Sequence, residues 1–165
     1  MKSKANKQIF VDMTLVKEKD GHKSLYPNTW MMVDQYSETK IVQCFKTKDA
    51  MVEPTCQLFF NWKLEGRLVL HLQMDNAGEN RQLVERLNSK DWKLHPSIEY
   101  TAHDTPQHNY LAEVAIATIA KHARAMMINA NILEHYRYLI QHKAMETAAK
   151  LDGLICKQID GVMKH

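Results

Sequence analysis

Three carboxylates of this sequence occupy positions where a simple surface charge is not expected. Asp12 interrupts an apolar segment, Asp75 ends another immediately before a turn, and Glu113 lies early in a segment rich in Ala, Ile and Met. Three carboxylates brought together do not all stay ionised without a cation, and hard oxygen ligands suit Mg²⁺ or Mn²⁺. Two such ions about 4 Å apart activate a nucleophile and stabilise a leaving oxygen at phosphorus. Since the chain has 19 acidic residues, most of which are expected to be solvated charges or caps, this chemistry depends on how the fold places these three.

The segments that carry these carboxylates have the periodicity of regular elements. Ile9, Val11, Met13 and Leu15 alternate with more polar residues, which is typical of a strand. By the same reasoning we expect strands at residues 8–16, 29–34, 41–45, 67–75 and 98–101. Helical spacing predicts helices at residues 47–65, at 79–90, and from 107 almost to the end with a break near 129–131. Residues 21–28 are polar and are expected to form a loop.

Local signals refine two of these elements. Thr47 or Asp49 can cap the helix at 47–65, Gly66 can stop it, and Pro54 is expected near its first turns or at a kink. In the strand at 67–75, the four residues Leu68, Leu70, Leu72 and Met74 share one face. The other face carries Val69, His71, Gln73 and Asp75.

The order of the elements predicts how the carboxylates are brought together. Three consecutive strands followed by alternating helices and strands indicate an α/β fold, with a mixed sheet and helices on its faces. In such a sheet, strand ends point into a common crevice, which is a usual place for a functional site.

Composition restricts the class of protein. The chain has 165 residues, which suits one domain, and its 45% hydrophobic and 25% charged residues match an average globular protein. It has no run of about 18 apolar residues, so no membrane-spanning helix is expected. Its three cysteines are scattered and odd in number, which favours a reducing compartment over a disulfide framework or a zinc site. The net charge of +3 is compatible with a nucleic-acid partner but does not by itself indicate one.

Four short blocks of the sequence resemble a known family. They are IFVDM at 9–13, LQMDNAGEN at 72–80, DTPQHNYLAE at 104–113 and ARAMM at 123–127. Together they are similar to the integrase catalytic core of copia-type LTR retrotransposons, within the DDE group of retroviral-integrase-like enzymes. The resemblance runs from about residue 8 to 131 and weakly to 154. It implies a ribonuclease H-like fold with a mixed five-stranded sheet flanked by helices, a core domain at 1–154, and a C-terminal tail or start of a linker at 155–165.

The resemblance also assigns roles to individual residues. It implies that Asp12, Asp75 and Glu113 are the catalytic carboxylates and bind two Mg²⁺ (or Mn²⁺) ions. Asp34 matches an aspartate that is not a metal ligand in the family, and we interpret it as structural or supporting. The activity implied is metal-dependent 3′-end processing of DNA followed by strand transfer, a polynucleotidyl transfer that inserts the element's DNA into target DNA.

Candidate DNA contacts lie on both sides of Glu113. Gln107 and Asn109 belong to the loop that shapes the substrate channel in the family. Lys121 and Arg124 fall on the same helical stripe as Glu113, where phosphates of a DNA strand would meet them. The alternative for both cations is a solvated helix face.

One segment departs from the family. Residues 114–120 are apolar where the family is usually basic and polar. This segment is expected to pack on the sheet, on Leu133, Tyr136, Leu139 and Ile140 of the following helix, or on a second copy of the chain.

The partners and the rival functions follow from these features. The implied partners are double-stranded DNA and, in the working complex, further copies of the chain; no membrane is involved. The expected location is intracellular, in the nucleus or in a cytoplasmic virus-like particle. Two alternatives stay open, namely a ribonuclease H-like nuclease and a catalytically inert nucleic-acid-binding or assembly module on the same fold.

Overall fold

The computed structural model describes residues 8–17, 22–101, 110–154, 157–159 and 162–164. Its centre is a five-stranded sheet in the order β3-β2-β1-β4-β5. The strands are β1 (Gln8–Lys17), β2 (Lys23–Asp34), β3 (Lys40–Phe45), β4 (His71–Asp75) and β5 (Ser97–Thr101). β1, β2 and β3 pair antiparallel, whereas β1 with β4 and β4 with β5 pair parallel. The mixed five-stranded sheet expected from the order of elements is confirmed.

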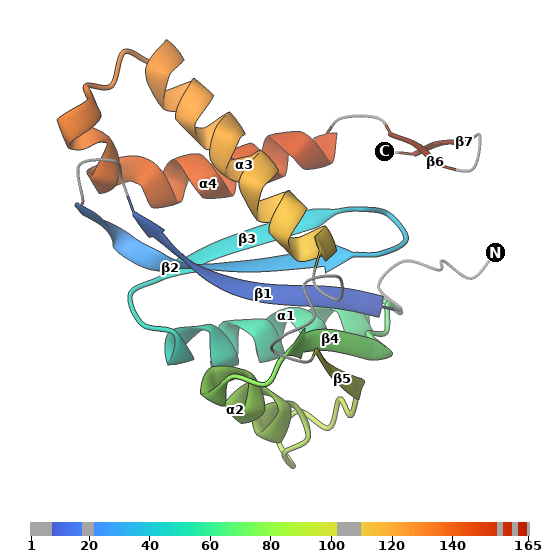
Figure 1. The fold of residues 1–165 in the computed structure, drawn as a ribbon. Coiled ribbons are helices and arrows are strands. Elements are labelled where there is room, and N and C mark those ends of the chain that lie inside the picture. Colours follow the sequence, from blue (N-terminus) through green and yellow to red (C-terminus); the bar gives the residue numbers. More distant parts are fainter. Residues whose placement is uncertain (1–7, 18–21, 102–109, 155–156, 160–161, 165) are drawn as a thin grey trace.

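Helices cover both faces of this sheet (Figure 1). The short 3₁₀ helix η1 (Asp49–Met51) leads into α1 (Val52–Leu64), which lies with α2 (Gly78–Leu87) on one face. α3 (Tyr110–Asn129), the 3₁₀ helix η2 (Glu134–Tyr136) and α4 (Arg137–Leu154) lie on the other side. The chain is therefore three layers deep, with the sheet in the middle.

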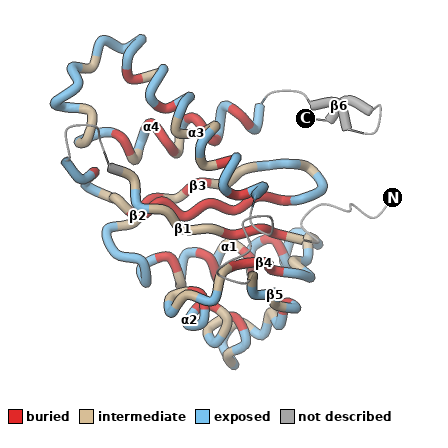
Figure 2. Tube along the Cα trace, in the orientation of Figure 1, coloured by how far each residue is buried: buried red, intermediate tan, exposed pale blue. Residues whose placement is uncertain are grey.

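Two apolar cores fill the spaces between these layers. Phe10, Met31 and Val33 project from the sheet into the core beneath α3 and α4. Ile9, Val11 and side chains of the neighbouring strands project into the core against α1 and α2. The strands that carry both cores are the most buried parts of the chain (Figure 2). Alternation along each strand thus assigns a residue to one core or the other.

The start of β2 differs from the sequence prediction, which placed a loop at 21–28. β2 begins at Lys23, and its polar residues are accommodated because the backbone pairs with β1, where Asn28 lies opposite Leu15. The Asn28 side chain donates hydrogen bonds to the carbonyls of Phe45 and Lys46, the latter at 2.9 Å. Polar composition alone therefore misidentified a hydrogen-bonded strand as a loop.

The start of β4 also differs. The strand expected at 67–75 begins only at His71, and Leu68 and Leu70 are exposed. The reason is pairing, since the parallel register with β1 begins at Gln8 opposite His71. An apolar alternation therefore extended beyond the hydrogen-bonded strand.

The helix boundaries match the sequence signals in part. Gly66, at φ +79°, follows α1 in the left-handed conformation that favours glycine, and Pro54 lies in the first turn, where its missing N–H costs nothing. The capping prediction was wrong, because Met51 is the residue before α1 and no side chain caps it. The break near 129–131 is confirmed, since α3 ends at Asn129 and Asn131 has φ +55°.

The C-terminal segment adds a short element that the sequence did not suggest. β6 (Lys157–Ile159) and β7 (Val162–Lys164) form an antiparallel pair separate from the main sheet. Within the described ranges, no helix is long and apolar enough to cross a membrane.

Candidate active site

The parallel pairing of β1 with β4 brings two of the candidate carboxylates together. Ile9 pairs with Leu72, and Phe10 pairs with Gln73. These pairs end at Phe10 and Gln73, and Asp12 and Asp75 each follow two residues later on the two neighbouring strands. The charge of Asp75 acts on Asp12, so two aspartates far apart in the sequence lie close together just beyond the paired part of β1 and β4.

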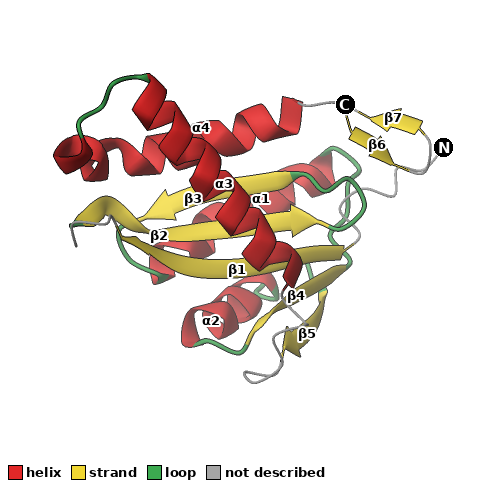
Figure 3. Cartoon of the chain, turned by 45° about the horizontal axis from the view of Figure 1, so that its top comes forward, coloured by secondary structure: helices red, strands yellow, loops and turns green. Residues whose placement is uncertain are grey.

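Both side chains belong to the same face of the sheet. Phe10 is part of the core beneath α3 and α4, and Asp12 follows it by two positions on the same side. Leu72 and Met74 belong to the opposite core, so Asp75 shares the face of Asp12. This face is the one that α3 crosses (Figure 3).

Glu113 reaches this face from the first turn of α3. Ala112 and Ala115 are buried in the core and fix the helix against the sheet, whereas Glu113 is exposed. α3 packs across β1 and β2 (Figure 3). Small residues beside the glutamate allow the helix to approach the sheet closely.

The protonation of Asp12 reports that the three carboxylates are close. Burial raises the pKa of Asp12 from 3.8 to about 6, the hydrogen bond from the Met13 N–H at 2.9 Å lowers it, and the charges of Asp75 and Glu113 raise it. Burial is the largest cause, and like-charge repulsion adds to it. In the absence of a cation, the charge of Asp12 is therefore costly.

Asp75 is held by the turn that follows its strand. Its Oδ1 accepts hydrogen bonds from the Ala77 N–H at 3.2 Å and from the Asn80 side-chain amide, which also donates to the main-chain oxygen of Asp75 at 3.2 Å. Asn80 was not identified from the sequence. The signal was present, because an asparagine in the first turn of a helix, just after a strand-end aspartate, often bonds to nearby groups.

The three carboxylates provide the donor set that a hard divalent cation needs. All three offer oxygen ligands, and within the described residues the hydrogen bonds to Asp12 and Asp75 use one oxygen of each carboxylate. In the part of the chain that the structure describes, no three His, Cys, Asp or Glu side chains are already gathered as tightly as the ligands of one ion. The chemistry of these three side chains fits a divalent cation.

The proposed DNA-contacting residues fall into two groups. Lys121 and Arg124 are exposed on α3, on the helical stripe that begins at Glu113, so both side chains are open to a ligand. Gln107 and Asn109 lie outside the described residues.

Asp34 has a structural role in the turn between β2 and β3. It is buried, and its Oδ2 accepts hydrogen bonds from the Ser37 N–H at 3.1 Å and from the Ser37 hydroxyl at 2.5 Å. Its main-chain N–H donates to the Thr39 carbonyl at 3.0 Å. These contacts order the hairpin and agree with the interpretation of Asp34 as a supporting residue.

Part of the apolar segment at 114–120 is internal. Ile119 is fully buried between α3 and the sheet, and Ile116 and Ala120 pack against the same core. Val114 is 43% exposed and points away from it. Of the arrangements considered for this segment, packing within one subunit is the one that the structure adopts for Ile119.

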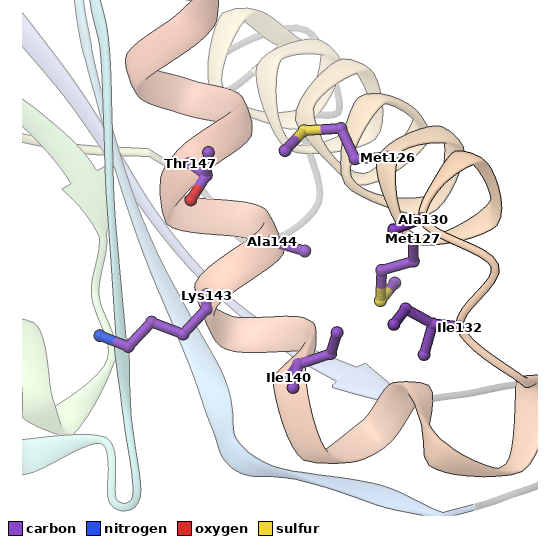
Figure 4. Close-up of a pocket in the computed structure, with 8 residues that line it drawn as sticks. All are labelled: Met126, Met127, Ala130, Ile132, Ile140, Lys143, Ala144 and Thr147. Carbon is purple, nitrogen blue, oxygen red and sulfur yellow. The ribbon is translucent and has the colours of Figure 1, made fainter.

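Two hollows are lined by described residues outside the candidate site. An apolar hollow of about 200 Å³ lies between the end of α3 and α4, lined by Met126, Met127, Ile132 and Ile140 among others (Figure 4). A polar hollow of about 190 Å³ lies further along β4 from Asp75, lined by the polar residues Gln8, His71, Gln73, Ser97 and Glu99 together with Leu72. Neither hollow includes Asp12, Asp75 or Glu113.

Comparison with known proteins shows which solved structures share this fold. No protein-family model matches the sequence, and no curated protein matches it. Among solved structures, the chain is similar to the HTLV-2 integrase catalytic core domain in complex with magnesium. In its trimeric form the TM-score is 0.60 at 18% identity, covering 96% of this chain and 93% of that one. The dimeric form gives 0.60 at 19% identity, with the same two coverages.

A third similar structure is a chain of the simian T-cell lymphotropic virus intasome, solved in complex with the PP2A regulatory subunit B56 gamma. The TM-score is 0.66 at 16% identity, and the match covers 92% of this chain and 50% of that chain. At such low identity these likenesses establish the fold. This chain has the ribonuclease H-like fold found in retroviral integrase catalytic cores.

Proposed function

We propose that this chain is the catalytic core of a copia-type retrotransposon integrase, which joins DNA ends to target DNA by metal-dependent phosphoryl transfer. The observation that carries the proposal is that Asp12 and Asp75 each follow, by two residues, the last pair of two adjacent parallel strands, with the charges of Asp75 and Glu113 acting on Asp12. A surface aspartate has no reason to be partly buried beside two other carboxylates. Such clustering is expected where carboxylates hold cations that in turn contact phosphate oxygens.

The structural neighbours support this proposal. The HTLV-2 core, which shares the fold, is in complex with magnesium, and the simian virus chain belongs to an intasome. In this chain we assign Asp12, Asp75 and Glu113 as the ligands of two Mg²⁺ or Mn²⁺ ions. When bound, the ions would activate the attacking oxygen and stabilise the leaving oxygen.

The reaction divides into two displacements at phosphorus. In the first, water attacks a phosphodiester near the 3′ end of the element's DNA, the bond to the 3′ oxygen of the upstream nucleotide breaks, and that oxygen leaves as a hydroxyl. In the second, this 3′-hydroxyl attacks a target-strand phosphate in line, so that one phosphodiester forms as another breaks. No covalent enzyme intermediate is needed, and the protein contributes positioning and charge.

The remaining residues bind and orient the DNA in this proposal. Lys121 and Arg124 extend from Glu113 along α3 and would meet successive phosphates of a strand that enters the site. Gln107 and Asn109 are proposed to contact DNA from the segment before α3. Two DNA ends must be held together for integration, so the working complex is proposed to contain several copies of the chain, acting on DNA inside the cell.

Two other functions remain as rivals. A ribonuclease H-like nuclease would use the same carboxylates on an RNA–DNA hybrid. A module without chemistry would keep the fold and need no metal, and its main support was the apolar segment at 114–120. The burial of Ile119 gives that segment a packing role within the subunit, which weakens this support.

The test uses a branched DNA substrate that mimics the product of strand transfer. The protein would resolve this DNA by the reverse of strand transfer, so the sequence of the element's ends does not have to be known. We expect Mg²⁺- or Mn²⁺-dependent resolution of this DNA by the wild type and none by Asp75→Asn. Cleavage of an RNA–DNA hybrid with no action on the branched DNA would favour the nuclease. Absence of both reactions, and of metal binding, would favour the inert module.

A further inference from the structure

Asn80 is a buried polar residue beside the candidate metal site to which no role has been assigned. It lies in the first turn of α2, is 2% exposed, and directs its side chain back to the end of β4. Its Nδ2 donates both to the Oδ1 of Asp75 and to the Asp75 main-chain oxygen. One amide group thus spans the carboxylate and the backbone of the same aspartate.

The orientation of this amide follows from its neighbours. Both atoms that it contacts are acceptors, so only the nitrogen can face Asp75. The Asn80 Oδ1 is left buried without a hydrogen-bond partner among the described residues. A buried unsatisfied acceptor is unfavourable. The arrangement therefore gives Asp75 its hydrogen bonds and leaves the Asn80 Oδ1 without one among the described residues.

The consequence for Asp75 is that its two oxygens are in different situations. Oδ1 is held by Asn80 and by the Ala77 N–H, whereas Oδ2 makes no hydrogen bond within the described part of the chain. A carboxylate fixed through one oxygen presents the other in a defined direction. Partners of this kind, which orient a metal ligand without touching the metal, typically change metal affinity by about 10- to 100-fold when they are removed.

We propose that Asn80 is a positioning residue for the metal site, which fixes the Asp75 carboxylate so that its second oxygen is available to a divalent cation. This inference rests on the proposed function, since it requires that Asp75 is a metal ligand. It also explains why an asparagine, a poor helix former, occupies the first turn of α2. Asn80 acts through Asp75 and does not touch the DNA.

The experiment compares the wild type with Asn80→Leu, which has nearly the same volume but no donor, and Asn80→Asp, which has the same shape but presents oxygen to Asp75. Asn88→Leu, at the exposed end of the same helix, is the matched control. Mn²⁺ binding is measured by the loss of the free-ion EPR signal, and folding by thermal unfolding in EDTA. DNA binding and the rate of branched-DNA resolution are measured separately.

We expect Asn80→Leu to bind Mn²⁺ about 10- to 100-fold more weakly than the wild type. Its affinity for DNA should stay within about twofold, because phosphate contacts lie elsewhere, so the loss appears in kcat and not in KM. Asn80→Asp should lose at least as much Mn²⁺ affinity, because an ionised partner repels Asp75. Asn88→Leu should match the wild type.

Three results would overturn the inference. In the first, Asn80→Leu folds and binds Mn²⁺ as tightly as the wild type, which would make Asn80 a packing residue only. In the second, neither Asn80 variant folds, which would make it a folding residue. In the third, the wild type itself binds no Mn²⁺, and then the proposed function fails together with the inference. The wild-type titration separates this third case from the other two.

Discussion

The Lys40 ammonium and the Asp152 carboxylate form an ion pair, with 2.7 Å between Nζ and Oδ2, that joins the start of β3 to the last turns of α4. Both side chains are largely shielded from water, at 14% and 8% exposed. β3 is an edge strand, and α4 covers it. The pair therefore links the edge strand β3 to α4.

Breaking this pair from one side should destabilise the protein strongly. We expect Asp152→Ala to lower the free energy of unfolding by about 3 kcal/mol, because Lys40 keeps a shielded charge without its partner. The double variant Lys40→Met with Asp152→Leu should lose less than Asp152→Ala alone, since it leaves no charge behind. Urea unfolding of the variants measures both effects. If the losses from Lys40→Met alone and Asp152→Leu alone simply added up in the double variant, the two residues would not be coupled.

Asp12 should make the metal-free protein less stable as the pH rises between about 4 and 6. Its pKa is 3.8 when unfolded and about 6 when folded, so in this window the folded protein keeps a proton that the unfolded chain releases. Each increase in pH then favours the unfolded chain, and the loss is complete above the folded pKa. Asp12→Asn should remove this dependence and stabilise the protein near neutral pH by on the order of 1–2 kcal/mol, after allowance for solvent screening.

Thermal unfolding in EDTA across this pH range tests the prediction, with the exposed Asp49→Asn as control. A parallel pH dependence in the wild type and Asp12→Asn would contradict it. Addition of Mg²⁺ to the wild type should recover stability at neutral pH, because a ligand that binds only the folded state stabilises it.

Asp75→Asn should abolish catalysis without harming the fold. The amide keeps an oxygen that can accept from Ala77 and Asn80, but it lacks the charge needed to hold a cation. We expect branched-DNA resolution to fall by at least about 100-fold, as when one charge-stabilising group is lost. The melting temperature in EDTA should equal or exceed that of the wild type, because repulsion from Asp12 is relieved. Full activity of this variant would show that Asp75 is not a metal ligand.

Lysine substitutions should separate the buried and exposed sides of α3. Ile119→Lys places a charge in a fully buried position and is expected to cost more than about 4 kcal/mol, enough to unfold the domain. Val114→Lys, on the exposed side, should change stability by no more than about 0.5 kcal/mol. Circular dichroism and light scattering over a concentration series measure folding and association together. If Ile119→Lys gave a folded monomer from a wild-type oligomer, this residue would belong to an interface between subunits.

Reversing the charges on α3 should weaken DNA binding in a salt-dependent way. Lys121→Glu and Arg124→Glu each remove a proposed phosphate contact, so each should reduce the slope of log K against log salt by about 1. Lys150→Glu makes the same charge change at an exposed position of α4 and serves as the control. Fluorescence anisotropy with duplex DNA at several salt concentrations measures the slopes. Equal slopes in all three variants would mean that the α3 cations only form a solvated face.

The sequence alone was sufficient where local chemistry decides the outcome. The alternation around Asp12 and before Asp75 determined the strands and the faces of these residues, because successive side chains in a strand point to opposite sides. Gly66 marked the end of α1, because its left-handed conformation suits glycine. The order of the elements was enough to expect a mixed five-stranded sheet.

The tertiary structure decided what depends on pairing between distant segments. The parallel pairing of β1 with β4 brings Asp12 and Asp75 to neighbouring strands, each two residues beyond the last pair, and no local pattern contains that arrangement. The true starts of β2 and β4 also follow from the strands beside them, which override composition. The bond from Asn80 to Asp75 and the burial of Ile119 arise only when α2 and α3 dock on the sheet. The physical reason is that periodicity specifies which way a side chain faces, whereas hydrogen-bond register and helix docking specify what it meets there.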